Sequence, residues 1–390
     1  MNRRTFIKVS SVPLLFPSLV NAQEATSNKS VVWIQLSGGA SHIETFNPIP
    51  DAPEEFRSVT GFVETNVPGI RYGGGFRKLS RFADKITVVN SFAHNSNGHG
   101  SGTHEVLTTV VNRDSDIANI QTQPSHGSVV SRYKGAIRNG MPTYITIDQG
   151  IGFRGASWLG NQFNNFNGLA GLDELTVSLE RFNSRRELLN TFSETSNFQT
   201  QAYSMLLGNV RDAFRKEREP EHVKRKYNYV NSSFGRNMLL TRRLIENGAG
   251  FVMVDIGGWD NHDKILDTMA VPMEHLDNIL PVFMEDLIQR GLDRDTLIVI
   301  TGEFGRTPRI NAGGGRDHWP QLSTLAFALG GSQGQVIGRS NSRAEVPVTR
   351  PITPADLRAT VFNHLEIPLN ITYNENGRPI HLCTGIPIGI

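Results

Sequence analysis

Short apolar runs alternate with helical segments along most of this chain, and the alternation constrains the fold more than any other feature. The runs are short, often contain β-branched residues, and are bounded by glycine or polar residues, as is typical of buried strands. Strands are predicted at residues 31–36, 86–89, 144–147, 251–255, 296–301 and 324–329. Helices are predicted at residues 76–82, 129–137, 234–247, 273–290 and 354–365. This order predicts an α/β fold in which a parallel or mostly parallel sheet carries helices on both faces.

Composition excludes several classes of protein. The 390 residues carry a net charge of +2, which gives no reason to expect nucleic acid or an anionic membrane as a partner. Cys383 is the only cysteine. The chain therefore has no intramolecular disulfide and no structural zinc site of the usual cysteine-ligated kind.

The first 22 residues have the order of an export signal. The stretch NRRTFIK carries a twin-arginine pair, and a short apolar run with two prolines leads to a small-residue site that ends at Ala22. That run is too short and too broken to span a bilayer. We predict a twin-arginine signal peptide over residues 1–22, a periplasmic or secreted protein, and no stable membrane anchor after cleavage. An accidental arginine pair on a general secretory signal is the alternative, and it also implies export.

The rest of the chain, residues 23–390, is predicted to be one α/β domain with an insertion. Residues 150–235 are rich in Asn, Gln and charged residues, and their Leu and Phe have helical spacing. We interpret this segment as a mostly helical insertion, which could serve as a lid.

Polar clusters follow four of the predicted strands, and six of the 11 histidines lie in them. Ligands of such sheets bind beyond the carboxyl ends of the strands, so we expect the four clusters to meet at one edge. They contain Ser41, His42 and Glu44; His94, His99, Ser101 and His104; Asp260, His262 and Asp263; and Glu303, Arg306, Asp317 and His318.

These residue types favour a metal site. Histidine and carboxylate ligands without cysteine suit zinc, manganese or iron. Glu303 ends an apolar strand, and a buried carboxylate needs a cation or several donors. Arg306 could clamp an anionic group or could simply pair with Glu303.

Structural roles remain open for the other residues. His42 could be an ordinary turn residue, and Asp260 and Asp317 could cap a helix and a turn. Ser101 lies where a glycine-rich turn enters a helix, so its hydroxyl could attack a bound phosphate or sulfate. Without further context, an ordinary N-cap serine is the favoured interpretation.

Six motifs, in order, resemble a bacterial sulfatase-like family known as domain of unknown function 1501. They are LSGGASHIETFNPIPDAPEEFRS, NVPGIRYGGGFRKLSRFADKITVVNSF, HGSGTHEVLTT, GGWDNHD, TGEFGRTPRINAGGGRDHWP and RPITPADLRATVF. The resemblance implies twin-arginine export and membership of the alkaline phosphatase superfamily. That superfamily has a doubly wound α/β sheet with metals at the carboxyl ends and hydrolyses phosphate or sulfate esters. The family itself has no settled activity.

The resemblance also implies ligands, with departures. Glu303 matches a superfamily aspartate ligand, Asp260 with His262 is similar to an aspartate–histidine pair, and His318 matches a late histidine ligand. However, Phe304 replaces a histidine, strand one ends in Ser37 rather than an aspartate, and the Cys-x-Pro-x-Arg signature of sulfatases is absent. A formylglycine mechanism is therefore not supported, and the standard two-metal site is incomplete.

Our leading hypothesis is an exported, metal-dependent hydrolase of phosphate or sulfate esters on small molecules or polymers. The metal is divalent, with zinc favoured over manganese and iron. The predicted ligands are Asp260, His262, Glu303 and His318, with His42, His99 and His104 as candidates for a second or reorganised site. Ser101 or a metal-bound water would be the nucleophile, and Arg306 would hold the anion. The alternative is a catalytically inactive relative that binds a periplasmic polymer or protein partner.

Overall fold

The computed structural model describes residues 27–138, 140–147, 152–169, 210–375 and 378–390. The predicted signal peptide lies outside these residues. Within them, no helix combines the length and the apolar character that crossing a membrane requires.

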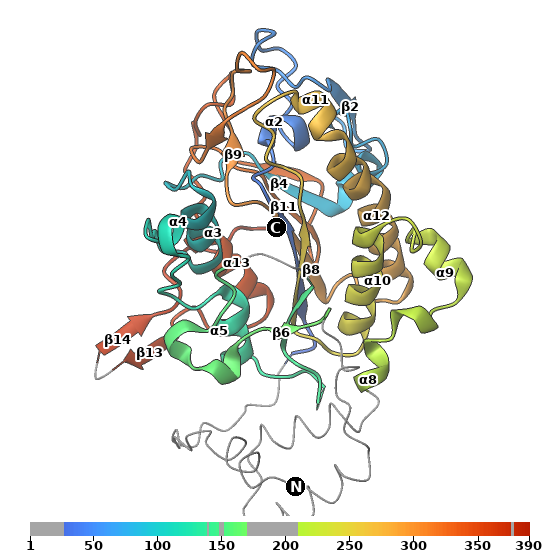
Figure 1. The fold of residues 1–390 in the computed structure, drawn as a ribbon, viewed down its shortest axis with the longest axis vertical. Coiled ribbons are helices and arrows are strands. Elements are labelled where there is room, and N and C mark those ends of the chain that lie inside the picture. Colours follow the sequence, from blue (N-terminus) through green and yellow to red (C-terminus); the bar gives the residue numbers. More distant parts are fainter. Residues whose placement is uncertain (1–26, 139, 148–151, 170–209, 376–377) are drawn as a thin grey trace, which may run out of the picture.

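Among the described residues, eight strands form a central sheet (Figure 1). In spatial order its strands are β12 (Gln335–Ile337), β4 (Ile86–Val89), β11 (Leu325–Leu329), β8 (Thr296–Thr301), β1 (Ser30–Leu36), β7 (Phe251–Ile256), β5 (Tyr144–Ile147) and β6 (Phe166–Asn167). β11 runs antiparallel to both of its neighbours, and the other pairs are parallel. The predicted mostly parallel sheet and all six predicted strands are confirmed.

Helices cover both faces of the sheet, as predicted (Figure 1). Alternate residues of β1 separate the two cores: Ile34 and Leu36 pack on one side, and Val31 and Trp33 on the other. The first face is covered by α10 (Ser233–Glu246) and α12 (Ala270–Gln289), and the second by α3 (His99–Thr108), α5 (His126–Tyr133) and α13 (Pro354–His364). The period-two alternation of a strand thus serves two helical layers.

Smaller elements surround this framework. The short helices are α2 (His42–Thr45), α4 (Ser115–Ala118), α8 (Val210–Ala213), α9 (Glu221–Lys226) and α11 (Ile265–Thr268). The two-stranded ribbons are β2 (Phe62–Glu64) with β3 (Arg71–Gly73), β9 (Gly305–Arg306) with β10 (His318–Trp319), and β13 (Thr372–Glu375) with β14 (Arg378–His381). The 3₁₀ segments are η1 (Leu79–Lys85), η2 (Ser157–Leu159), η3 (Asn161–Phe163) and η4 (Lys216–Arg218).

One predicted helix differs in type. The α-helix predicted at residues 76–82 is instead the 3₁₀ segment η1, shifted toward the C-terminus. The carboxylate of Asp277, on α12, accepts the backbone N–H groups of Lys78 and Leu79 at 2.9 and 2.8 Å. A tertiary contact therefore fixes the start of a segment too short to set its own helix type.

The predicted insertion is described only in part. Residues 152–169 contain η2, η3 and the edge strand β6, and residues 210–235 contain α8, η4 and α9. The stretch between them lies outside the described residues, so the mostly helical character of the insertion stays a prediction.

Candidate metal centre

The candidate site lies at the carboxyl ends of three adjacent central strands, β8, β1 and β7. β8 leads to Glu303, β1 to Gly38, and β7 to Asp260. Gly38 has a φ of +109°, and a Cβ at this position would overlap the backbone nitrogen of Asp260. A glycine is therefore required where these two loops cross.

A return of the chain brings His318 to the same edge. β9 and β10 pair antiparallel, with His318 opposite Arg306. The glycine-rich turn between them lies against the loop after β7, where a Cβ on Gly315 would overlap the carbonyl oxygen of His262. The glycines thus permit the close backbone approach that places His318 beside Asp260 and His262.

His99, Asp260 and His318 form a compact group of metal-ligand types. One donor atom from each lies within 4.8 Å of the others. Asp260 Oδ1 is 3.3 Å from His318 Nε2, and Asp260 Oδ2 is 3.4 Å from His99 Nε2. His262 Nε2 adjoins the group, 3.1 Å from Asp260 Oδ1 and 3.0 Å from His318 Nε2.

The three imidazoles are held by acceptors on their outer sides. His99 Nδ1 lies 2.9 Å from Glu303 Oε1, His262 Nδ1 lies 2.7 Å from Asp317 Oδ1, and His318 Nδ1 lies 2.7 Å from the carbonyl oxygen of Asn97. A carbonyl or carboxylate oxygen accepts, so each Nδ1 carries the hydrogen. In the neutral imidazole each Nε2 then turns a lone pair toward Asp260, which is the arrangement of metal-ligating histidines.

The donor set fits a divalent cation. Two Nε2 atoms 3.0 Å apart, both bonded through Nδ1 elsewhere, need a shared proton or a cation between them. Ligand atoms on a tetrahedral zinc with bonds of about 2.1 Å lie about 3.4 Å apart, close to the spacings around Asp260. Two imidazoles and one carboxylate, with His262 adjoining them, suit zinc, manganese or iron, so the chemistry of the set matches the predicted metal class.

Arg306 is committed to the protein rather than exposed to a ligand. Its side chain is fully buried. The guanidinium donates to the carbonyl oxygens of Gly38, Gly39 and Arg316 and to Asp260 Oδ1, the last at 2.6 Å. Partial burial acts to raise the pKa of Asp260, but the hydrogen bond and charge of Arg306 outweigh it and lower that pKa to about 2. Arg306 therefore keeps Asp260 ionised and fixes its orientation, and its partner is Asp260 rather than Glu303.

Glu303 lies behind His99. The carboxylate is buried, and Oε1 accepts from the Gly38 N–H at 2.8 Å and from His99 Nδ1. The hydrogen bond to Glu303 raises the pKa of His99, while burial is the main cause that lowers the pKa of His318. Glu303 therefore contacts His99 from behind, whereas the sequence predicted that it would itself be a metal ligand.

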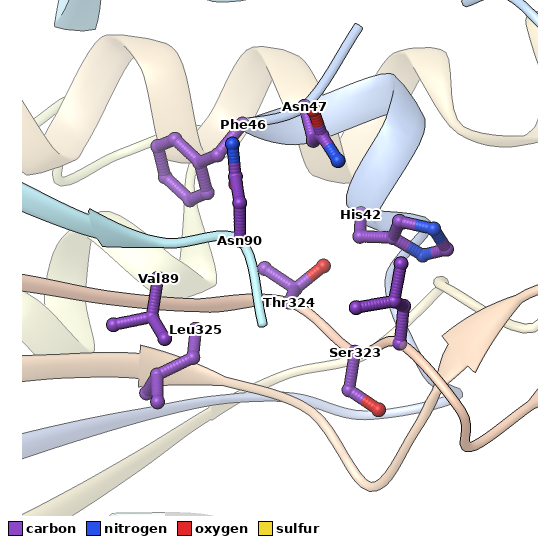
Figure 2. A pocket seen from close by; sticks show the side chains of 9 residues that line it. His42, Phe46, Asn47, Val89, Asn90, Ser323, Thr324 and Leu325 are labelled. Carbon is purple, nitrogen blue, oxygen red and sulfur yellow. The ribbon is translucent and has the colours of Figure 1, made fainter. Parts of the chain in front are cut away.

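His42 and His104 are not brought into the group. His42 Nε2 lies 3.0 Å from the carbonyl oxygen of Ala344, and His104 Nδ1 lies 2.8 Å from that of Val110. Figure 2 shows His42 at a small pocket lined with Phe46, Val89 and Leu325. Both histidines serve local structure in this conformation.

Ser101 is hydrogen-bonded to groups other than the donors. Gly98, not Ser101, is the N-cap of α3. The Ser101 N–H donates to Asp116 Oδ1 at 2.7 Å, and its buried hydroxyl donates to the carbonyl oxygen of Gly98 at 3.4 Å. The carboxylate of Asp116 thus occupies the position at the helix start that we considered for a phosphate or sulfate.

Buried neutral histidines predict acid lability. Burial lowers the pKa of His42 and of His364 to about 4. Their native pKa values lie below the unfolded value, so the stability they contribute is complete above pH ~6.5 and is lost as pH falls toward 4. Each of the two histidines should lower the free energy of unfolding by roughly 2 kcal/mol between pH 7 and pH 5.

Urea unfolding at the two pH values measures this loss. The double variant His42→Gln with His364→Gln should show a flatter pH dependence, while the exposed-residue control His222→Gln should match wild type. An equal drop in the double variant and in wild type would contradict the assignment.

Three groups that contact the candidate site residues were not predicted from the sequence as part of the site. Asn97 contributes a backbone carbonyl, which carries no residue signature. The ring of Phe304 stacks on His318, with centroids 4.2 Å apart and planes 30° apart. Gln35 donates to Glu303 Oε2 at 3.3 Å, and a polar residue within an otherwise apolar strand was the one signal that could have revealed it.

Comparison with solved structures gives remote similarities. The lipoteichoic acid synthase LtaP from Listeria monocytogenes is 12% identical with a TM-score of 0.42, over 92% of this chain and 75% of that chain. The PsFucS1 sulfatase from Pseudoalteromonas sp. is 13% identical with a TM-score of 0.41, over 87% and 68%. The alkaline phosphatase from the Antarctic bacterium TAB5 is 14% identical with a TM-score of 0.39, over 88% and 100%. No curated protein matches the sequence significantly.

A family model matches residues 28–387, which include every described element of the central sheet. This match confirms the family that the six motifs predicted. The chain belongs to the family described as protein of unknown function (DUF1501).

Proposed function

We propose that the protein is a metal-dependent hydrolase of phosphate or sulfate esters. The observation that carries this proposal is the convergence of His99, His262 and His318 on Asp260, with each imidazole held by an acceptor at Nδ1. Such a set, at the carboxyl edge of a mostly parallel sheet, is equipped to bind a cation.

The residues divide into ligands and supports. His99, Asp260, His262 and His318 would hold the metal, while Glu303, Asp317 and the carbonyl of Asn97 fix the imidazoles. A bound divalent cation supplies Lewis acidity, which activates water and offsets charge that develops on the ester oxygens.

Water is the nucleophile that the geometry favours. The hydroxyl of Ser101 is buried and bonded to Gly98, whereas Asp260 and His262 are each close to half exposed and accessible from solvent. The side chain of Arg306 positions Asp260, so clamping the substrate's anionic group falls to other groups. Zinc as the metal, export through the twin-arginine pathway, and a periplasmic or secreted location belong to the same proposal.

The test is a metal assay followed by a substrate panel. Purified full chain is analysed by inductively coupled plasma mass spectrometry and then assayed on 4-nitrophenyl phosphate, bis(4-nitrophenyl) phosphate and 4-nitrophenyl sulfate. Near-stoichiometric zinc, manganese or iron, with hydrolysis that a chelator abolishes, is the expected result. Folded protein that stays metal-free after incubation with these ions would reject the proposal, and metal-loaded protein without turnover would favour the inactive, partner-binding alternative.

A further inference from the structure

Gln35 is a fully buried amide near the carboxyl end of β1. It shares a face of the strand with Trp33, toward the helix α3 that supplies His99. An amide in such a position is costly unless its donors and acceptor are satisfied. Its partners therefore show what the residue does.

The partners form a hydrogen-bonded chain that ends on Glu303, the carboxylate behind His99. Trp33 Nε1 donates to Gln35 Oε1 at 3.0 Å, and Gln35 Nε2 donates to Glu303 Oε2 at 3.3 Å. Because an indole N–H can only donate, the amide oxygen must face Trp33 and the amide nitrogen must face Glu303. The direction of the chain is thus fixed from the core outward.

The last link joins Glu303 to His99. Gln35 holds Oε2, so Oε1 is left to accept from the Gly38 N–H at 2.8 Å and from His99 Nδ1 at 2.9 Å. With Nδ1 occupied, His99 Nε2 faces Asp260. The orientation of His99 is therefore linked through Glu303 to a residue of the core.

We propose that Gln35, with Trp33 behind it, is a positioning residue of the metal centre: it fixes the rotation of the Glu303 carboxylate and through it the ring of His99. This inference rests on the proposed function, because it requires that His99 bind a metal. Without the amide, Oε2 is a buried acceptor that lacks a donor, and the carboxylate can turn away from His99.

The alternative is that Gln35 only stabilises the core. The two roles separate when zinc affinity and stability are measured on the same variants. Gln35→Met keeps the length of the side chain and removes the amide. We expect zinc affinity, measured by competition with a chelator, to fall roughly 10- to 100-fold, as for other outer partners of metal ligands.

A double-mutant cycle tests whether Gln35 affects zinc affinity through Glu303. In a Glu303→Gln background, Gln35→Met should cause no further loss of affinity, because its target carboxylate is gone. Thr296→Val is the matched control: Thr296 is a buried hydroxyl at the opposite end of the same strands, 3.2 Å from Ser30 Oγ. This control should leave zinc affinity unchanged.

Trp33→Phe provides a second variant if Gln35→Met fails to fold. It removes the indole N–H together with part of a fully buried ring system, so stability is measured beside zinc affinity. The loss of zinc affinity should be smaller than for Gln35→Met and in the same direction. Equal zinc affinity in wild type and in the variants, or an equal loss from Gln35→Met in both backgrounds, would overturn the positioning role alone. A folded wild-type chain that binds no zinc would overturn the metal centre, and this inference with it.

Discussion

Asp260→Asn is expected to remove most zinc binding and all ester hydrolysis while the fold persists. Asp260 is the residue around which the centre is built, because its two oxygens contact His262, His318 and His99 at 3.1–3.4 Å. The substitution removes the one carboxylate among the proposed ligands. Zinc affinity should therefore fall by more than roughly 100-fold, the upper range for residues that only hydrogen-bond to metal ligands. The fold should survive because the side chain is 47% exposed, and the amide oxygen can still accept from Arg306.

His318→Ala should also remove most zinc binding, because it deletes an imidazole rather than the carboxylate. It deletes one of the Nε2 donors and leaves the remaining proposed ligands on the start of α3 and on the loop after β7. Zinc is quantified after dialysis by inductively coupled plasma mass spectrometry, hydrolysis is followed with the most active ester, and urea unfolding reports the fold. Asp263→Asn is the matched control, since Asp263 is an exposed carboxylate on the same loop as Asp260.

Three outcomes are distinguishable. Loss of zinc in Asp260→Asn and His318→Ala, with retention in Asp263→Asn, supports the assignment. Retention of zinc in all variants would place the metal elsewhere in the chain. Loss of zinc that follows unfolding in every variant would show that Asp260 and His318 serve structure.

Sequence patterns predict the sheet well because buried strands require apolar residues, which are visible in the sequence. The runs that form β1, β7 and β8 are apolar on both faces, as strands under two helical layers must be. The same pattern does not show direction, so the antiparallel course of β11 was not predictable. The 3₁₀ form of η1 was also not predictable from local sequence, because it depends on a contact with Asp277, almost 200 residues away in sequence.

The site was predictable as a region but not as a set of contacts. The strand ends predict that Asp260, Glu303 and His318 lie at one edge, and the structure places them there. Whether a carboxylate reaches a cation or a histidine behind it depends on side-chain direction within a few ångströms, and Glu303 reaches His99. For the same reason α2 directs His42 to Ala344, although the sequence places it just beyond the central strand.

Glu44→Gln is expected to lower the free energy of unfolding by about 3–5 kcal/mol, the range for breaking a buried ion pair on one side. Glu44 and Arg316 have fully buried side chains, and Arg316 Nη2 lies 3.0 Å from Glu44 Oε1. The guanidinium also donates to the carbonyl oxygens of Thr307 and Pro308, while Ser58 donates to Glu44. Removing the carboxylate charge leaves a buried cation that only dipoles compensate.

The control pair lies on the surface. Glu64 and Arg71 are 2.8 Å apart but 59% and 41% exposed, so Glu64→Gln should change stability by no more than about 0.5 kcal/mol. The double variant Glu44→Leu with Arg316→Met should be less destabilised than either single variant, because it leaves no unpaired charge. A loss in Glu44→Gln no larger than that in Glu64→Gln would contradict this account.

The ion pair also connects the core to the metal centre. Arg316 holds the turn at residues 307–308 and precedes His318 by two positions, so its displacement should move the histidine that β10 returns to Asp260. Glu44→Gln should therefore lower stability and zinc affinity together, whereas Asp260→Asn should lower zinc affinity with little change in stability. Because these variants affect the two quantities in different proportions, measuring both separates residues that build the loop from residues that bind the cation.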